Sequence, residues 1–253
     1  MLKRLLFCII ALASLHGIAQ PSVAGKSYEM EMEQERLSCF MEFINTDDYY
    51  IEVSSQETED IVYVVVLSYG KYKVEDGRLV LMDALHDYQM EMTLADETLL
   101  IQKGFEFMKG KCFVRNGTSY RTNIPGIDEN INKANIQEER DRYIVQNNEL
   151  HNLTYGRYKA MKFQFFLDLD ENKTYTYCFG YKGCSLSKGT WERNGNVLYL
   201  YDASLDCTFY LLIGDDNRLI SKSLPGSNGN VFKMVRTSSS QQPQKGGFGC
   251  SRR

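Results

Sequence analysis

The chain has 253 residues, of which 43% are hydrophobic and 12% aromatic, so it can bury one large core or two small ones. This composition excludes an intrinsically disordered protein or a fibre, and the formal net charge of -4 makes nucleic acid a poor partner. The charge is uneven, with 9 basic and 19 acidic residues in 20–120 against 11 basic and 8 acidic residues in 151–236. Either the two halves are solvated independently, or they attract each other and dock.

Residues 1–19 have the pattern of a cleaved secretory signal. Two basic residues precede the apolar residues 5–12, and the small residues Gly17 and Ala19 end the segment. Cys8 follows bulky side chains, whereas lipid attachment requires small ones before the cysteine. No later segment reaches the roughly 18 apolar residues needed to cross a bilayer. We therefore expect a soluble protein that is secreted or periplasmic and carries no lipid.

The sequence contains an internal repeat. With a shift of 119 positions, residues 70–103 align without a gap to residues 189–222, and ten of the 34 positions are identical. The identities include Gly70 with Gly189 and Asp83 with Asp202. Upstream the shift becomes 126, because the first copy has seven extra residues before Gly70. Two copies of one structural unit therefore make up most of the chain.

Each copy alternates apolar and polar residues in short runs that are separated by turn residues, which is typical of an antiparallel meander. We predict an all-β protein with two tandem small barrels of six to seven strands each, because closure removes sheet edges. The barrels should occupy residues 20–120 and 151–236. Residues 121–150 should form a linker with a helix after Pro125, and residues 237–253 a disordered tail.

The second copy resembles the small lipocalin-like barrel at the N-terminus of the NlpE-type copper-homeostasis lipoproteins. The residues that carry the resemblance are Gly156 to Tyr158, the run "FQFFLDLDENKTYTY", Gly189 to Trp191, "NVLYLYD" and "FYLLIGDDNRLI". The resemblance implies an envelope protein that senses stress or binds a partner. The family's Cys-x-x-Cys pair and lipid-attachment cysteine are absent, so copper handling does not carry over.

Few residues are suited to catalysis or to metal binding. Only His86 and His151 lie beyond the signal, and we expect both to face solvent without a role, which excludes a histidine-based zinc site or a Ser-His-Asp triad. Seven of the ten methionines fall in the first copy, where packing in the core is favoured over cuprous ion binding. We predict no enzyme activity, no cofactor and no metal site.

Six cysteines follow the signal, and an exported protein with an even number invites disulfides. Cys178 and Cys184 are candidates for a bridge across a hairpin loop. Cys39 and Cys112 are candidates for a bridge between the first and last strands of the first barrel. Buried free thiols are the alternative for both pairs.

The aromatic residues suggest an interaction surface. Tyr175, Tyr177, Tyr199 and Tyr201 alternate along two strands of the second copy, and clustered exposed tyrosines are typical of binding surfaces, although aromatic pairing across a sheet also produces them. We expect a non-enzymatic module that binds an unknown protein or small ligand, or that senses envelope stress. The alternative is a secreted inhibitor that presents residues 54–65 as a loop.

Overall fold

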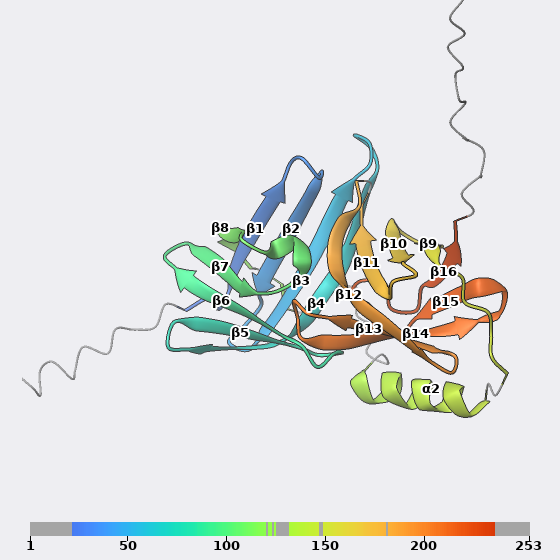
Figure 1. The fold of residues 1–253 in the computed structure, drawn as a ribbon. Helices are drawn as coiled ribbons and strands as arrows, with labels where there is room; N and C mark the ends of the chain where they lie inside the picture. The colour runs from blue at the N-terminus through green and yellow to red at the C-terminus, as the bar shows by residue number, and fades with distance from the viewer. Residues whose placement is uncertain are drawn as a thin grey trace, which may run out of the picture.

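The computed structural model describes residues 22–119, 121–122, 124, 132–146, 149–180 and 182–235. The expected signal and tail lie outside these residues. The described chain forms two closed antiparallel barrels of eight strands each (Figure 1). This confirms the all-β tandem architecture, with more strands in each barrel than the sequence predicted.

The first barrel closes because its first and last strands pair with each other. A short 3-10 helix, η1 (Glu106–Met108), precedes the last strand. The strands are β1 (Lys26–Met32), β2 (Leu37–Phe43), β3 (Asp48–Gln56), β4 (Val62–Glu75), β5 (Arg78–Asp83), β6 (Gln89–Ala95), β7 (Thr98–Lys103) and β8 (Cys112–Thr118).

The second barrel repeats this order and closes by pairing of its first and last strands. The linker helix α2 (Lys133–Gln146) lies along it, where Ile136 packs against Tyr210 and Leu212 (Figure 1). The strands are β9 (Gly156–Ala160), β10 (Phe165–Leu169), β11 (Thr174–Phe179), β12 (Cys184–Asn194), β13 (Val197–Asp202), β14 (Cys207–Gly214), β15 (Arg218–Ser221) and β16 (Val231–Met234), with the short η2 (Asp215–Asn217) before β15.

The seven extra residues of the first copy lengthen one hairpin. β3 has 9 residues against 6 in the equivalent β11, and β4 has 14 against 11 in β12. The turn between β3 and β4 takes up the one remaining residue. Residues 54–65, which the sequence analysis described as a loop, are therefore mostly ordered strand.

The second barrel docks against the inner face of this long hairpin. Gly180 lies so close to Ser55 that an added Cβ would be 2.6 Å from the serine Oγ. A Cβ on Gly226 would be 3.4 Å from a methyl group of Val65. Buried apolar residues of both barrels form one continuous hydrophobic cluster. Of the two alternatives that the charge distribution left open, the structure shows docked halves.

Polar contacts reinforce the docked arrangement. Glu106 accepts hydrogen bonds from Ser204 Oγ at 2.8 Å and from Lys188 Nζ at 2.5 Å, both in the second barrel. Burial alone would raise the pKa of Glu106, but hydrogen bonds from Lys109, Lys188 and Ser204 outweigh burial and hold its pKa at about 2. Glu106 therefore stays ionised in the interface at neutral pH.

The expected disulfides are not present. Cys39, Cys112, Cys178, Cys184 and Cys207 are all free thiols. Cys39 lies on β2, not on the first strand, so β1 separates it from the strand of Cys112. In the β11–β12 hairpin, Cys178 lies opposite Ser185 and Cys184 opposite Phe179, so the two cysteines are not direct cross-strand partners.

Two glycines of the repeat are required because neighbouring strands approach closely. An added Cβ on Gly70 would lie 2.1 Å from the carbonyl oxygen of Met82, and one on Gly189 would lie 1.9 Å from that of Tyr201. Gly70 pairs with Asp83, and Gly189 pairs with Asp202. This contact with rigid backbone explains why the repeat keeps both glycines.

Replacement of either glycine by alanine should destabilise the protein by roughly 3 kcal/mol, because the backbone must move to admit the methyl group. Gly214→Ala is the matched control, since its added Cβ would meet atoms no closer than 3.8 Å. Urea unfolding of the three variants measures these effects. Equal stability of Gly70→Ala and Gly214→Ala would contradict the proposed close contact.

Candidate functional site

A groove of about 360 Å³ lies between the two barrels. One wall is formed by residues 64–69 of β4 and by the loop between β5 and β6, which contributes Leu85 and His86. The other wall belongs to the second barrel. Most of the lining is apolar, with a few polar side chains, which is typical of binding sites.

The β4 wall is the free edge of a strand. β4 pairs with β3 from Val62 to Lys71, but it pairs with β5 only from Gly70 to Glu75. No strand in the described chain pairs with the other side of residues 62–68. The seven extra residues lengthen this edge, because β4 extends eight residues beyond its pairing with β5, whereas the equivalent β12 extends five residues, 184–188, beyond its pairing with β13.

The opposite wall is held by a hydrogen-bonded loop between β15 and β16. Tyr177 donates to the carbonyl oxygen of Pro225 at 2.8 Å, and Ser227 donates its amide to Leu224 at 3.1 Å. The loop places Leu224, Gly226 and Asn228 in the groove. The Nδ2 of Asn228 is buried and has no hydrogen-bond partner among the described residues.

Phe163 completes this wall from the turn between β9 and β10. Its side chain is 43% exposed, and its backbone has a φ of 63°. The left-handed region is unfavourable for a bulky aromatic residue, and strain of this kind is found at functional sites more often than elsewhere. The turn thus holds a large aromatic ring at the rim of the groove.

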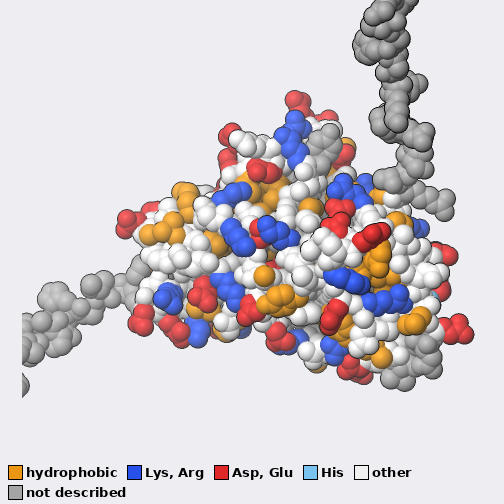
Figure 2. All heavy atoms as spheres, in the orientation of Figure 1, with side chains coloured by type: hydrophobic (Ala, Val, Ile, Leu, Met, Phe, Trp, Pro, Cys, Tyr) orange, Lys and Arg blue, Asp and Glu red, His pale blue; other side chains and the backbone are white. Residues whose placement is uncertain are grey.

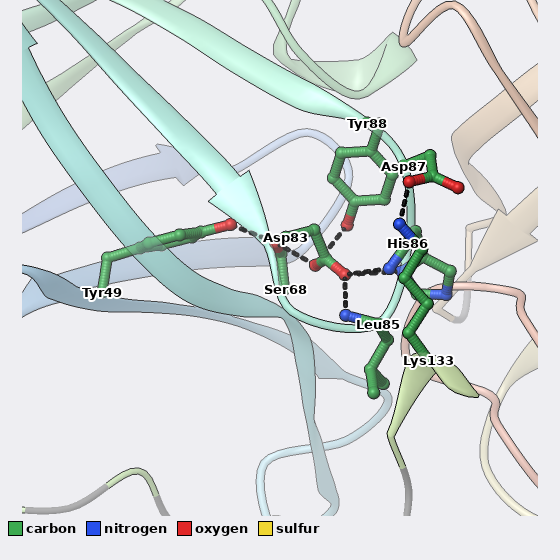
Figure 3. A network of polar contacts seen from close by, with 8 residues as sticks. All are labelled: Tyr49, Ser68, Asp83, Leu85, His86, Asp87, Tyr88 and Lys133. Atoms are coloured by element: carbon green, nitrogen blue, oxygen red, sulfur yellow. Dashed lines mark hydrogen bonds and ion pairs between the residues drawn. The ribbon is translucent and has the colours of Figure 1, made fainter. Parts of the chain in front are cut away.

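Asp83 lies at the centre of a buried polar network at the end of the groove (Figure 3). Its Oδ1 accepts hydrogen bonds from the amides of Leu85 and His86 and from His86 Nδ1, the last at 2.7 Å. Its Oδ2 accepts from the hydroxyls of Ser68 and Tyr88. Ser68 uses its only proton here, so the hydroxyl of Tyr49 donates to Ser68 Oγ at 2.9 Å.

This network keeps Asp83 ionised. Burial alone would raise the pKa of Asp83, but the neighbouring His86 and the donated hydrogen bonds outweigh burial and hold the pKa below its usual range. An ionised carboxylate only accepts hydrogen bonds, so Nδ1 of His86 carries a proton. The other ring nitrogen, Nε2, is buried without a partner among the described residues, and His86 lines the groove.

The second barrel has a simpler version of the same network. Tyr175 and Ser187 occupy the positions of Tyr49 and Ser68, and their hydroxyls lie 2.6 Å apart. Asp202 accepts from the amides of Ser204 and Leu205. Leu205 is buried at the position that corresponds to His86. Asp202 therefore lacks the histidine, and its Oδ2 has no partner in the described chain.

The expectation that His86 faces solvent is wrong, because its side chain is only 8% exposed and is paired with Asp83. His151 lies within 3.1 Å of the exposed Asp215. Most methionines of the first barrel are buried in its core, as predicted, including Met30, Met41 and Met90.

The four tyrosines predicted to form an interface do not share a surface. Tyr175 and Tyr177 are buried inside the second barrel, because the tyrosine face of β11 points inward and Thr174 and Thr176 lie on the other face. Tyr199 faces outward but packs beside helix α2. Tyr201 is 45% exposed and donates a hydrogen bond to Asp206 at 2.9 Å.

The groove does not contain an activated nucleophile of the Ser-His-Asp kind. Ser68 donates to Asp83 and not to His86, so the histidine cannot take its proton. Among the described residues, no three of the side chains His, Cys, Asp and Glu are grouped to hold a metal ion. The groove therefore presents polar groups that are fixed by hydrogen bonds, on walls that are mostly apolar.

Comparison of the chain with protein-family models, with curated proteins and with solved structures gives no match. None of the helices in the described residues combines the length and apolar character needed to span a membrane.

Asp83→Asn should lower the free energy of unfolding by about 3 kcal/mol at pH 7, because the amide cannot accept all the hydrogen bonds that the carboxylate accepts. The pKa of Asp83 is depressed in the folded state, so its stabilisation is complete above the unfolded value of about 3.9 and is lost as the pH falls further. The gap between wild type and variant should therefore narrow below about pH 4.

Asp87→Asn is the control for this prediction. It lies in the same loop, but its side chain is exposed and pairs with Lys133 at the surface, so we expect a change below about 0.5 kcal/mol. Chemical denaturation between pH 3 and pH 7 measures both variants. Similar effects at Asp83 and Asp87 would show that the buried network contributes nothing to stability.

Proposed function

We propose that this protein is an exported, non-enzymatic binding module that holds its ligand in the groove between the two barrels. The observation that carries the proposal is a preformed, mostly apolar groove lined by His86 and Asn228, whose buried Nε2 and Nδ2 have no hydrogen-bond partner in the described chain. Buried polar groups are normally paired, so two unpaired nitrogens on residues that line the groove favour an external partner.

Export is supported by the signal-like residues 1–19, and a role in the envelope by the resemblance of the second barrel to the NlpE-type barrel. Figure 2 shows acidic and basic side chains interspersed over both barrels, with hydrophobic side chains in small separate groups. A surface of this kind is typical of a soluble protein.

A second candidate function is that of a secreted inhibitor that presents the tip of the β3–β4 hairpin. The observation in its favour is that Ile61 and Val62, at this tip, are exposed apolar residues. Inhibition of a protease panel that is lost on Ile61→Ser would support this function over the first.

Native mass spectrometry of the protein produced with its own leader tests the groove as the binding site. Phe163→Ser removes an aromatic ring from the groove, whereas Tyr201→Ser removes a similarly exposed ring from the outer face of the second barrel. We expect a co-purified species whose occupancy falls at least tenfold in Phe163→Ser and is unchanged in Tyr201→Ser. The reverse pattern would place the site on the tyrosine face, and a protein that never retains a ligand would contradict the proposal.

A further inference from the structure

The free edge of β4 indicates what kind of ligand the groove takes. In an antiparallel strand every second residue turns its N–H and C=O groups toward the same side. Residues 62–68 have β3 on one side only, so the groups on the other side form an unpaired row. Such a row is a template for another strand, and proteins that expose one either cover it or use it for binding.

The edge is kept open by the chain that follows. β5 pairs with β4 up to Gly70, and the amide of Ala84 then donates to Tyr69 at 2.8 Å. The carboxylate of Asp83 accepts hydrogen bonds from the amides of Leu85 and His86, and the chain turns away from β4 at this point. This aspartate, which both copies of the repeat share, thus marks the end of the pairing between β4 and β5. The unpaired part of β4 extends beyond that end.

The shape of the groove excludes a second copy of this edge. The edge lies opposite Phe163, Gly226 and Asn228 of the second barrel, so it is recessed. The same edge in another copy would lie in an identical recess, and two recessed edges cannot meet. The occupant must therefore be a single extended segment with no sheet on its other side.

The lining also indicates the chemistry of the segment. Val64, Phe163 and Leu224 are apolar, and no Lys, Arg or Glu of the described chain lines the groove. Its one carboxylate, Asp83, is already hydrogen-bonded on both oxygens. Asn228 adds an amide side chain to these walls, and its buried Nδ2 donor has no partner in the described chain. An uncharged segment with small or β-branched side chains fits these walls.

We propose that the groove binds an extended, uncharged polypeptide segment of a partner protein, which pairs with residues 62–68 of β4 as an added strand. This inference rests on the proposed function and specifies its ligand class. Main-chain hydrogen bonds to the edge would supply affinity, and the apolar walls would select the side chains that face them.

The probe is a displayed library of random ten-residue peptides without Asp, Glu, Lys or Arg, selected against the full chain. The affinity of enriched peptides is then measured by fluorescence anisotropy. Each peptide is also made in two N-methylated forms. One form is methylated at the odd-numbered amides and the other at the even-numbered amides. We expect one register to lose at least tenfold in affinity and the other to change less than threefold, because only one set of amides faces the edge.

Val64→Lys places a charge in the groove, and Val114→Lys, the control, places one on β8. The two valines are similarly exposed, Val64 at 50% and Val114 at 52%. We expect Val64→Lys to weaken peptide binding at least tenfold and Val114→Lys to leave it unchanged, with similar melting temperatures for both. Equal sensitivity of the two N-methylated registers, or equal binding by the two variants, would overturn strand addition.

The failure of this inference can be distinguished from the failure of the proposed function. If no library peptide binds saturably while a small molecule still co-purifies in a manner that depends on Phe163, the groove is a binding site but its ligand is not a polypeptide. If neither a peptide nor any other species depends on the groove, both proposals are wrong.

Discussion

The inner face of the β3–β4 hairpin is the constraint on which the rest of the structure depends. The hairpin extends beyond the closed part of its barrel, yet Val53, Val65 and Leu67 on this face are almost fully buried. Apolar side chains of this size are worth roughly 1.5–3 kcal/mol each when they are removed from water. The second barrel supplies the cover, so the two barrels share one continuous core.

This arrangement accounts for the position of the groove. The second barrel covers the side chains on the inner face of the hairpin. It does not cover the backbone groups along the edge of β4. The Asp83 network then fixes the end of the groove, with Tyr49, Ser68 and Tyr88 as its donors on one side and His86 on the other (Figure 3). Stability and the candidate site therefore depend on the same residues.

The repeat made the fold predictable, because the period-two alternation and the paired identities both specify a duplicated β-unit. The repeat matched Gly70 with Gly189 and Asp83 with Asp202, but it did not show why both copies keep these residues. The reasons are a close approach of the backbone at the glycine and a buried carboxylate at the aspartate. The free edge could not be found in the same way. The seven extra residues were visible in the alignment, but their placement as strand outside the barrel depends on contacts with the second barrel.

The tyrosines and His86 were misplaced for a related reason. Alternation shows that two faces of a strand differ, but it does not show which face is inside when one carries tyrosine and the other threonine, as in β11. His86 aligns with Leu205, a buried apolar residue, and this correspondence was the one signal in the sequence that indicated burial.

Residue-resolved amide hydrogen exchange along β4 tests the central claim most directly. We expect alternation from Val62 to Val66, before the bulge at Leu67, with slow exchange at amides that donate to β3 and rapid exchange at amides that face the groove. Gly70 and Lys71, which pair with both β3 and β5, should be protected on both sides. Uniform protection of every amide from Val62 to Ser68 in the protein without ligand would show that the edge is already paired, and it would contradict the account.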